Sequence, residues 1–250
     1  MDILFIGAGN MGGAIIRGME QSGHAITIYT HNPAKVEGLK TAFPFCEVVS
    51  GEAADISGKV VVLAVKPQVY KGVKTTGKAK ALISVMAGVS LAAIRECFDA
   101  EYVVRSMPNV AAAKGLSATA FTGDEGFRDE TKAILDCFGQ GIWVGSEKEL
   151  NVATAVAGSG PAYMMLVAEA LADGAVRMGL KRPAAAQLVQ GLFEGSAALL
   201  TDGHPGVIKD SVMSPGGTTA YGYAALEDGK VRDGFIKAIE AAVKRAEELA

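Results

Sequence analysis

Short apolar runs alternate with segments of helical periodicity up to about residue 145 of the chain. Residues 3–6 contain only apolar side chains, which is typical of a central parallel strand buried on both faces. Residues 11–21 then place apolar side chains at helical spacing, and a second helix is predicted to begin after Asn32-Pro33. Further strands are predicted at residues 25–29, 60–65, 81–86, 102–104, 117–122 and 142–144. Strands and helices that alternate in this way indicate βαβ units and a parallel sheet.

The pattern changes after residue 145, where alanine-rich segments of helical period replace the strands. The clearest of these segments are residues 163–178, 183–200 and 231–250. We therefore predict an α/β protein: an N-terminal Rossmann-type doubly wound sheet in residues 1–146, followed by an all-α C-terminal domain in residues 147–250.

Composition excludes several classes of partner and location. Half of the 250 residues are hydrophobic and the net charge is −3 without a basic cluster, so neither nucleic acid nor a membrane is expected as a partner. The three cysteines show no metal-ligand spacing, and no metal site is predicted. The uncharged run at residues 152–168 is too short for a membrane span and is interrupted by Gly158-Ser159-Gly160-Pro161. Because the first residues also lack the features of a signal peptide, a cytoplasmic location is expected.

A glycine-rich motif of the form GxGxxG directly follows the first predicted strand and opens the first predicted helix. Glycine permits the sharp turn, the close approach of the backbone to a pyrophosphate and the packing of helix on strand. The helix N-terminus then offers free N–H groups to an anion. The motif predicts a dinucleotide site formed by Gly7, Ala8, Gly9, Asn10, Met11 and Gly12.

The end of the second predicted strand indicates which dinucleotide is bound. Enzymes that use NAD tend to place an acidic residue there, whereas this chain has Thr30, His31 and Asn32, followed by Lys35. Hydroxyl, amide and cation suit the 2′-phosphate of NADPH, so NADPH is favoured over NADH. The alternative is a solvated loop in which Asn32 only caps the following helix.

Four further segments, taken together and in this order, closely resemble the pyrroline-5-carboxylate reductase family over nearly the whole chain. They are Ala64-Val65-Lys66-Pro67-Gln68, Arg105-Ser106-Met107-Pro108-Asn109, Gly158-Ser159-Gly160-Pro161-Ala162-Tyr163 and Ser214-Pro215-Gly216-Gly217-Thr218-Thr219. The resemblance implies that the nicotinamide half of the cofactor is surrounded by Ala64, Val65, Lys66, Pro67, Ala87 and Gly88, and we add Asn109 to the cofactor site. The third segment predicts a tight glycine turn before a helix, with Pro161 in its first turn.

The last segment is a glycine-rich entry to a helix that combines exposed N–H groups with three hydroxyls, and this arrangement suits a carboxylate. The resemblance implies that the substrate is bound by Ser214, Gly216, Gly217, Thr218 and Thr219. Thr219 would face the ring nitrogen of the substrate and is the predicted catalytic residue, in an orienting role. The expected reaction transfers hydride from NADPH to the imine carbon of 1-pyrroline-5-carboxylate and yields L-proline, the last step of proline biosynthesis.

The chain departs from the family pattern at a few positions. Tyr223 stands where a small aliphatic residue is usual, Val110-Ala111 follow Asn109, Gly51 replaces a common Asn near the ribose, and Asp202 replaces a common Glu.

Two other interpretations stay open. A related NADPH-dependent imine or β-hydroxyacid reductase would share this build, but the β-hydroxyacid enzymes need a catalytic lysine, and Lys181 and Lys209 lack the expected context. A non-catalytic NADPH-binding regulator would not need the loop at residues 214–219.

The C-terminal segments are too apolar for a small isolated bundle, and the resemblance implies a homodimer or higher oligomer through them.

Overall fold

The computed structural model describes residues 1–249, which divide into two compact units. One unit contains residues 1–159 together with the residues from 241 onward, and the other contains residues 160–240. The predicted boundary after residue 146 stays a prediction, because the chain is continuously helical from Glu147 to Arg177.

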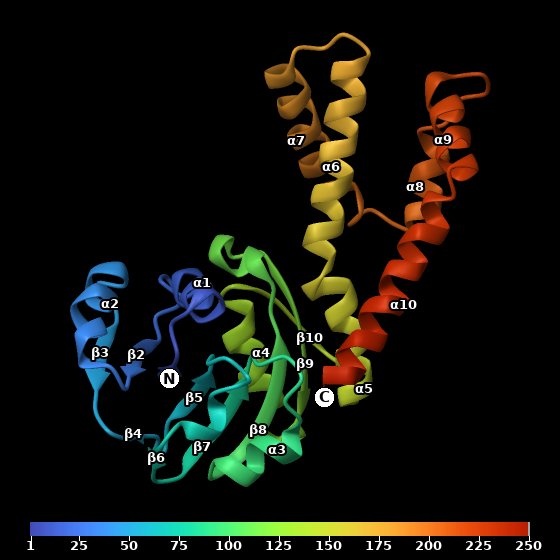
Figure 1. Cartoon of the computed structure of the whole chain (residues 1–250). Coiled ribbons are helices and arrows are strands. Elements are labelled where there is room, and N and C mark those ends of the chain that lie inside the picture. Colours follow the sequence, from blue (N-terminus) through green and yellow to red (C-terminus); the bar gives the residue numbers. More distant parts are fainter. Residues whose placement is uncertain (250) are drawn as a thin grey trace. The chain divides into compact units, whose positions relative to one another are not determined.

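The first unit is built on an eight-stranded sheet in the order β10-β9-β8-β7-β5-β1-β2-β3 (Figure 1). Its strands are β1 (Asp2–Ile6), β2 (Ala25–Thr30), β3 (Glu47–Ser50), β5 (Val60–Leu63), β7 (Ala79–Ser84), β8 (Ala100–Met107), β9 (Ser117–Gly123) and β10 (Gly139–Trp143). Neighbouring strands are parallel except β8 and β9, where Ser106 lies opposite Phe121 in an antiparallel register. A second, two-stranded parallel sheet pairs β4 (Ala54–Asp55) with β6 (Thr75–Thr76). The predicted doubly wound α/β fold is confirmed.

Both faces of the large sheet are buried, as the apolar runs predict. Successive residues of β1 alternate between two cores, with Ile3 and Phe5 in one and Leu4 and Ile6 in the other. Each fully buried side chain of this size contributes about 1.5–3 kcal/mol to stability. The α-helices of this unit are α1 (Asn10–Gly18), α2 (Val36–Ala42), α3 (Leu91–Cys97), α4 (Arg128–Asp136), α5 (Glu147–Ala153) and the last part of α10 (Val231–Leu249).

The segment around Gly158 differs from its prediction. Instead of a tight turn, the structure has a π-helix, Thr154–Gly158, in which the Ser159 N–H donates to the Thr154 carbonyl at 3.1 Å. The reason is that α5, the π-helix and the next helix continue one another, so the glycines lie within a helical stretch. Pro161 still falls in the first turn of α6 (Gly160–Arg177), as predicted. By length and composition alone, the stretch Glu147–Arg177 is apolar enough to cross a membrane.

The secondary-structure elements described in the second unit are all helices, joined by turns. Its helices are α6 (Gly160–Arg177), α7 (Arg182–Leu199), α8 (Pro205–Ser211), α9 (Thr218–Asp228) and the start of α10 (Val231–Leu249). α6 and α7 pack side by side as a hairpin (Figure 1), with Arg182 paired to Asp173 at 2.5 Å. Unlike the first unit, the second unit has many exposed apolar side chains. Ala185 is the one buried hydrophobic residue described between residues 160 and 240.

Candidate functional site

Two glycines allow the loop after β1 to close against the turn that follows β5. Gly7 has φ +102°, a left-handed conformation, and a Cβ there would lie 2.7 Å from the Ala64 carbonyl oxygen. A Cβ on Gly12 would lie 2.4 Å from the Gly7 carbonyl oxygen. Larger residues at either position would force the backbone apart, so the loop conformation depends on both glycines.

The N-terminus of α1 is open to a ligand. Gly9 is the N-cap residue and no side chain caps the helix within the described chain. A Cβ on Gly9 would meet no atom within 4 Å, so the backbone here faces open space. Free N–H groups at the positive end of a helix are a site for a pyrophosphate.

The loops after β1, β2, β5 and β7 surround a cleft of about 900 Å³. These four strands are neighbours in the sheet, and β1 lies at the point where the strand order reverses, which is where doubly wound sheets bind their ligands. The cleft collects most of the predicted cofactor residues: Gly7, Ala8, Gly9, Asn10, Met11, Thr30, His31, Lys35, Ala64, Val65, Lys66, Pro67 and Ala87.

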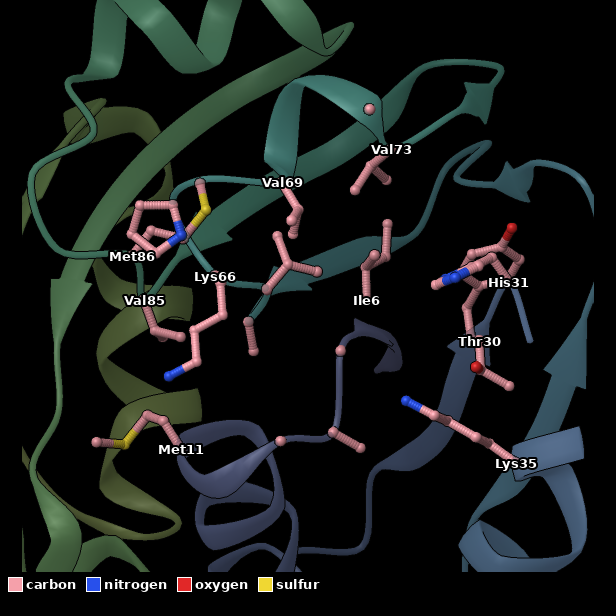
Figure 2. A pocket seen from close by; sticks show the side chains of 18 of the residues that line it. Ile6, Met11, Thr30, His31, Lys35, Lys66, Val69, Val73, Val85 and Met86 are labelled. Atoms are coloured by element: carbon pink, nitrogen blue, oxygen red, sulfur yellow. The ribbon is translucent and has the colours of Figure 1, made fainter.

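The side chains divide the cleft into two ends (Figure 2). Thr30, His31 and Lys35 lie together at one end, and the Thr30 hydroxyl accepts a hydrogen bond from the Asn32 N–H at 3.2 Å. Met11 and Lys66 lie at the opposite end. The cationic and hydroxyl groups of the first end are suited to a phosphate on the adenosine ribose.

The predicted substrate loop opens α9 in the second unit. Gly217 is the N-cap of α9, and its N–H donates to the Ser214 carbonyl at 3.0 Å. A Cβ on Gly217 would lie 2.4 Å from Ser214 Oγ, which places this hydroxyl directly against the first turn of the helix. Among residues 1–249, the hydroxyls of Ser214, Thr218 and Thr219 make no hydrogen bond.

A helix N-terminus with adjacent free hydroxyls can bind a carboxylate through charge-assisted hydrogen bonds. Gly216 has φ +70°, so the turn that exposes these groups needs glycine at this position. The N-cap residue of α9, Gly217, has no side chain that could cap the helix, so the first N–H groups of α9 are open to a ligand.

Comparison with known proteins identifies both halves of the chain. Residues 2–88 match the family model "NADP oxidoreductase coenzyme F420-dependent", and residues 147–249 match "Pyrroline-5-carboxylate reductase dimerisation". The pyrroline-5-carboxylate reductase of Glycine max is 38% identical over 98% of this chain and 94% of its own length.

The chain belongs to the pyrroline-5-carboxylate reductase family. The solved structure of a pyrroline-5-carboxylate reductase from Coxiella burnetii has a TM-score of 0.87 at 31% identity and covers 100% of this chain and 98% of that chain. The Plasmodium falciparum family member, solved with NADP bound, has a TM-score of 0.81 at 25% identity, with 100% and 99% covered. The predicted family, oxidoreductase class and NADP cofactor are confirmed.

Four predicted cofactor residues of this family member do not line the cleft: Gly12, Asn32, Gly88 and Asn109. Gly12 packs beneath the loop, as described above. Asn32 accepts a hydrogen bond from the Ala34 N–H at 3.0 Å and so caps the turn that follows β2, which was the alternative interpretation of this residue.

Asn109 is buried and its side chain is occupied by the protein itself. Its Nδ2 donates to the Ala157 carbonyl at 2.9 Å, and its Oδ1 accepts from the Ala111 N–H at 2.9 Å. The hydrogen bonds of Asn109 therefore connect the end of β8 to the π-helix, because the chain after β8 packs against that segment.

The cleft also contains residues that the sequence did not indicate, among them Tyr29, Glu52, Val69, Val73 and Lys74. The Tyr29 hydroxyl donates to the Gly51 carbonyl at 2.8 Å, and burial raises the pKa of this phenol. Val69 and Val73 follow Lys66-Pro67 closely and flank the short 3₁₀-helix Tyr70–Gly72, so their apolar side chains could have been predicted to line the cleft. No sequence pattern marks Glu52 and Lys74 as cleft residues, because it is the small β4-β6 sheet that brings their segments together.

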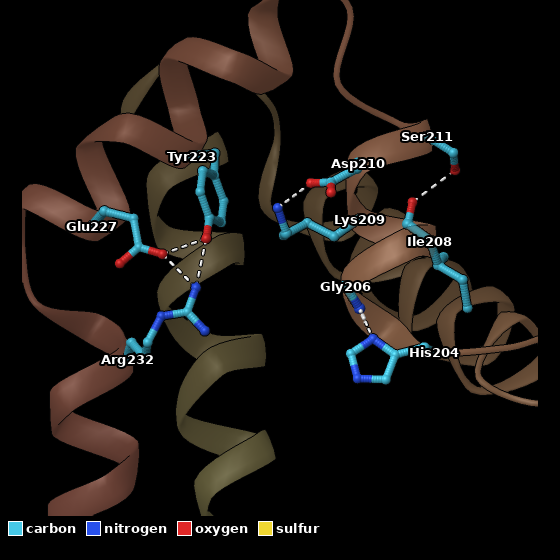
Figure 3. Close-up of polar contacts among 9 residues, drawn as sticks. All are labelled: His204, Gly206, Ile208, Lys209, Asp210, Ser211, Tyr223, Glu227 and Arg232. Carbon is cyan, nitrogen blue, oxygen red and sulfur yellow. Dashed lines mark hydrogen bonds and ion pairs between the residues drawn. The ribbon is translucent and has the colours of Figure 1, made fainter.

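Tyr223, one of the departures from the family pattern, lies one helical turn after Thr219 in α9. Its hydroxyl donates to Glu227 and accepts from Arg232 at 2.6 Å, and Lys209 lies 4.8 Å from its ring centroid (Figure 3). These contacts join α8, α9 and α10, so the tyrosine has a packing role that a small aliphatic residue does not have.

Proposed function

We propose that this chain is a pyrroline-5-carboxylate reductase that transfers hydride from NADPH to the imine carbon of 1-pyrroline-5-carboxylate and releases L-proline. The observation that carries the proposal is the loop at Ser214–Thr219, which presents free hydroxyls and an uncapped helix N-terminus within a region that matches this family. A general NADP-binding protein needs the cleft of the first unit but has no use for this loop.

The cleft fits a dinucleotide phosphate. The pyrophosphate would lie over the open backbone at Gly9, and the 2′-phosphate would meet Thr30, His31 and Lys35. The turn at Lys66-Pro67 and the loop at Ala87-Gly88 would enclose the nicotinamide half. When bound there, NADPH supplies the hydride, and the protein supplies position and electrostatics.

The substrate loop would hold the carboxylate of the cyclic imine. Ser214 and the backbone of Gly216, Gly217 and Thr218 are suited to the two carboxylate oxygens, while the Thr219 hydroxyl would orient the ring nitrogen. A clamp remote from the reacting carbon raises the rate by fixing which face of the ring is presented for hydride transfer.

The proposal requires no strong general acid. An imine that binds as the protonated pyrrolinium becomes a neutral secondary amine when its carbon accepts hydride, so the nitrogen needs no further proton. Two of the three histidines have other contacts: His204 Nδ1 caps α8 by accepting from the Gly206 N–H at 3.1 Å, and His24 lies 3.7 Å from the Cys137 sulfur. Burial also lowers the pKa of His24, so a smaller fraction of this imidazole carries a proton that it could donate.

We further propose that the helical unit forms a homodimer or higher oligomer, and that the enzyme works in the cytoplasm without nucleic acid or membrane partners. The apolar stretch Glu147–Arg177 would then be covered by another copy of the chain rather than by lipid. Its π-helical turn and its charged residues Glu169 and Asp173 favour a protein partner. Fractionation of a cell lysate tests this point, with the protein expected in the supernatant.

The decisive experiment mixes purified protein, NADPH and 1-pyrroline-5-carboxylate and follows the loss of NADPH absorbance. The expected result is turnover with proline as the product, and no turnover with a β-hydroxyacid and NADP. NADPH binding without turnover of the imine would indicate the regulator instead.

A further inference from the structure

Arg105 is a buried cation in strand β8 of the Rossmann-type sheet. It lies near the end of β8, is 3% exposed, and its guanidinium bonds Glu147 Oε1 at 2.5 Å. Its Nε has no hydrogen-bond partner among the residues that the structure describes. A buried charge is tolerated only where it is paired, so Arg105 depends on Glu147.

The same Glu147 oxygen also accepts a hydrogen bond from the Leu91 N–H at 3.0 Å. Leu91 is the first residue of α3, and Ser90, the N-cap, accepts from the Ala93 N–H at 3.2 Å. The side chain of a residue 56 positions later therefore completes the N-terminal cap of α3. A carboxylate in this position satisfies an otherwise unpaired N–H and interacts favourably with the helix dipole.

The start of α3 is also the end of the loop that follows β7, whose residues Val85, Met86 and Ala87 line the cofactor cleft. The other end of this loop is held by Ser84, whose Oγ accepts from the Met86 N–H at 3.2 Å. The Ser106 hydroxyl in turn donates to the Ser84 carbonyl at 3.3 Å. Two consecutive residues of β8 thus hold the two ends of one loop, Ser106 directly and Arg105 through Glu147.

We propose that Glu147, oriented by Arg105, is a positioning residue that sets the cofactor loop 85–90 for hydride transfer. The proposal rests on the placement of the nicotinamide half beside Ala87-Gly88 in the proposed function. Glu147 is also the first residue of α5 and of the region that matches the dimerisation model, so one carboxylate anchors this region and the cofactor loop to the same strand.

The chain offers a matched control at the far end of α3. Asp124 Oδ2 accepts from the Val103 N–H at 2.7 Å and pairs with Arg95 at 2.5 Å, so it too joins α3 to β8 through one backbone N–H and one arginine. Its side chain is 32% exposed and that of Glu147 is 35% exposed. Asp124 does not line the cleft. Loss of Asp124 should loosen α3 without moving the cofactor loop.

The test compares two double variants of the full-length enzyme. Arg105→Met/Glu147→Gln removes both charges and keeps an acceptor for the Leu91 N–H, whereas Arg105→Met/Glu147→Met removes the acceptor as well. Because neither variant leaves a buried unpaired charge, both should fold with similar Tm. The Met variant is expected to have kcat about tenfold below that of the Gln variant, because small misplacements of a reacting group cost up to about a hundredfold. KM for NADPH should change less than about threefold between them, since the pyrophosphate and adenosine contacts persist.

A second measurement is independent of turnover. Hydrogen–deuterium exchange of residues 85–91 should be faster in the Met variant than in the Gln variant, and Asp124→Met should leave it unchanged while lowering Tm. Equal kcat and equal exchange in the two double variants would overturn the proposal, as would an equal loss of kcat in Asp124→Met. Failure of the proposed function looks different: the unmodified enzyme would not reduce the imine, while the exchange difference would remain.

Discussion

The two compact units of this chain bury their apolar residues to very different degrees. Residues 1–159 contain two continuous cores, one on each face of the sheet, in which Ile3, Leu4 and Phe5 are almost completely buried. In residues 160–240, large apolar side chains such as Leu188 (63% exposed) and Met165 (61% exposed) face outward. A sheet covered on both faces completes its own core, whereas helices that are apolar on several faces need another surface to cover them.

The contrast fits the proposal that the helical unit associates with another copy of the chain, whereas the first unit already covers its own apolar residues. The match of residues 147–249 to a dimerisation model supports the same conclusion. An enzyme built in this way should bind the cofactor as a single chain but lose its activity when the helical unit is deprived of its partner, because the stability of that unit then depends on protein concentration.

The largest effect is expected from a variant that disrupts the association of the helical unit and leaves the first unit unchanged. Leu188→Glu/Leu192→Glu places two charges on the exposed apolar face of α7, and burying unpaired charges in an interface costs several kcal/mol, about 3–5 for each. We expect the mass in light scattering to fall from at least a dimer to near 25.7 kDa, and turnover to fall more than about a hundredfold. NADPH binding should persist.

The control for this variant is Gln187→Glu, which adds a charge at a neighbouring polar position of α7 and should change neither mass nor turnover. If the unmodified protein is already a monomer in light scattering, the apolar faces of the helical unit are not covered by another copy of the chain.

A change in the first unit should affect the cofactor and leave assembly unchanged. Lys35→Glu replaces a cation at the adenosine end of the cleft with an anion that repels the 2′-phosphate and accepts from a 2′-hydroxyl. The ratio of kcat/KM for NADPH over NADH should fall by about one to two powers of ten, or about 1.4–3 kcal/mol. Equal efficiency with both cofactors in the unmodified enzyme would refute the assigned preference.

Thr219→Ala tests the substrate loop of the helical unit rather than its proposed interface. Loss of one positioned hydrogen bond should cost about 1–3 kcal/mol, so kcat should fall about ten- to a hundredfold with little change in NADPH binding. Thr218→Ala keeps the backbone N–H and should have a smaller effect. If Thr219 only supports the helix, Thr219→Ala will lower Tm and leave kcat intact, and steady-state kinetics with thermal denaturation on both variants separate the two roles.

The smallest effect is expected at Tyr223, one of the departures from the family pattern. Tyr223→Val removes an exposed network with Glu227 and Arg232, and such surface contacts contribute little. We expect kcat to change by less than about threefold and Tm to fall by only a few degrees, about 4 °C at most. A large loss of kcat would instead give Tyr223 a part in substrate binding.

Much of the first unit was predictable from the sequence because its signals are local. Fully apolar runs locate β1 and β5, and a mostly apolar run locates β7, without any knowledge of their partners. The GxGxxG motif identifies the cofactor loop through the stereochemistry of Gly7 and Gly12. The edge strand Glu47–Ser50 escaped prediction, because it is only half buried and has no continuous apolar run.

The sequence by itself determined the order of strands and helices, the class of cofactor and the family, since each depends on residues adjacent in the chain. Only the tertiary structure decided which residues complete the cleft and which support it. Glu52 and Lys74 reach the cleft through a small second sheet, Asn109 bonds the π-helix instead of the cofactor cleft, and Arg105 meets Glu147 across 42 positions of sequence. Contacts of that separation leave no periodicity or motif, because the packing of distant segments creates them.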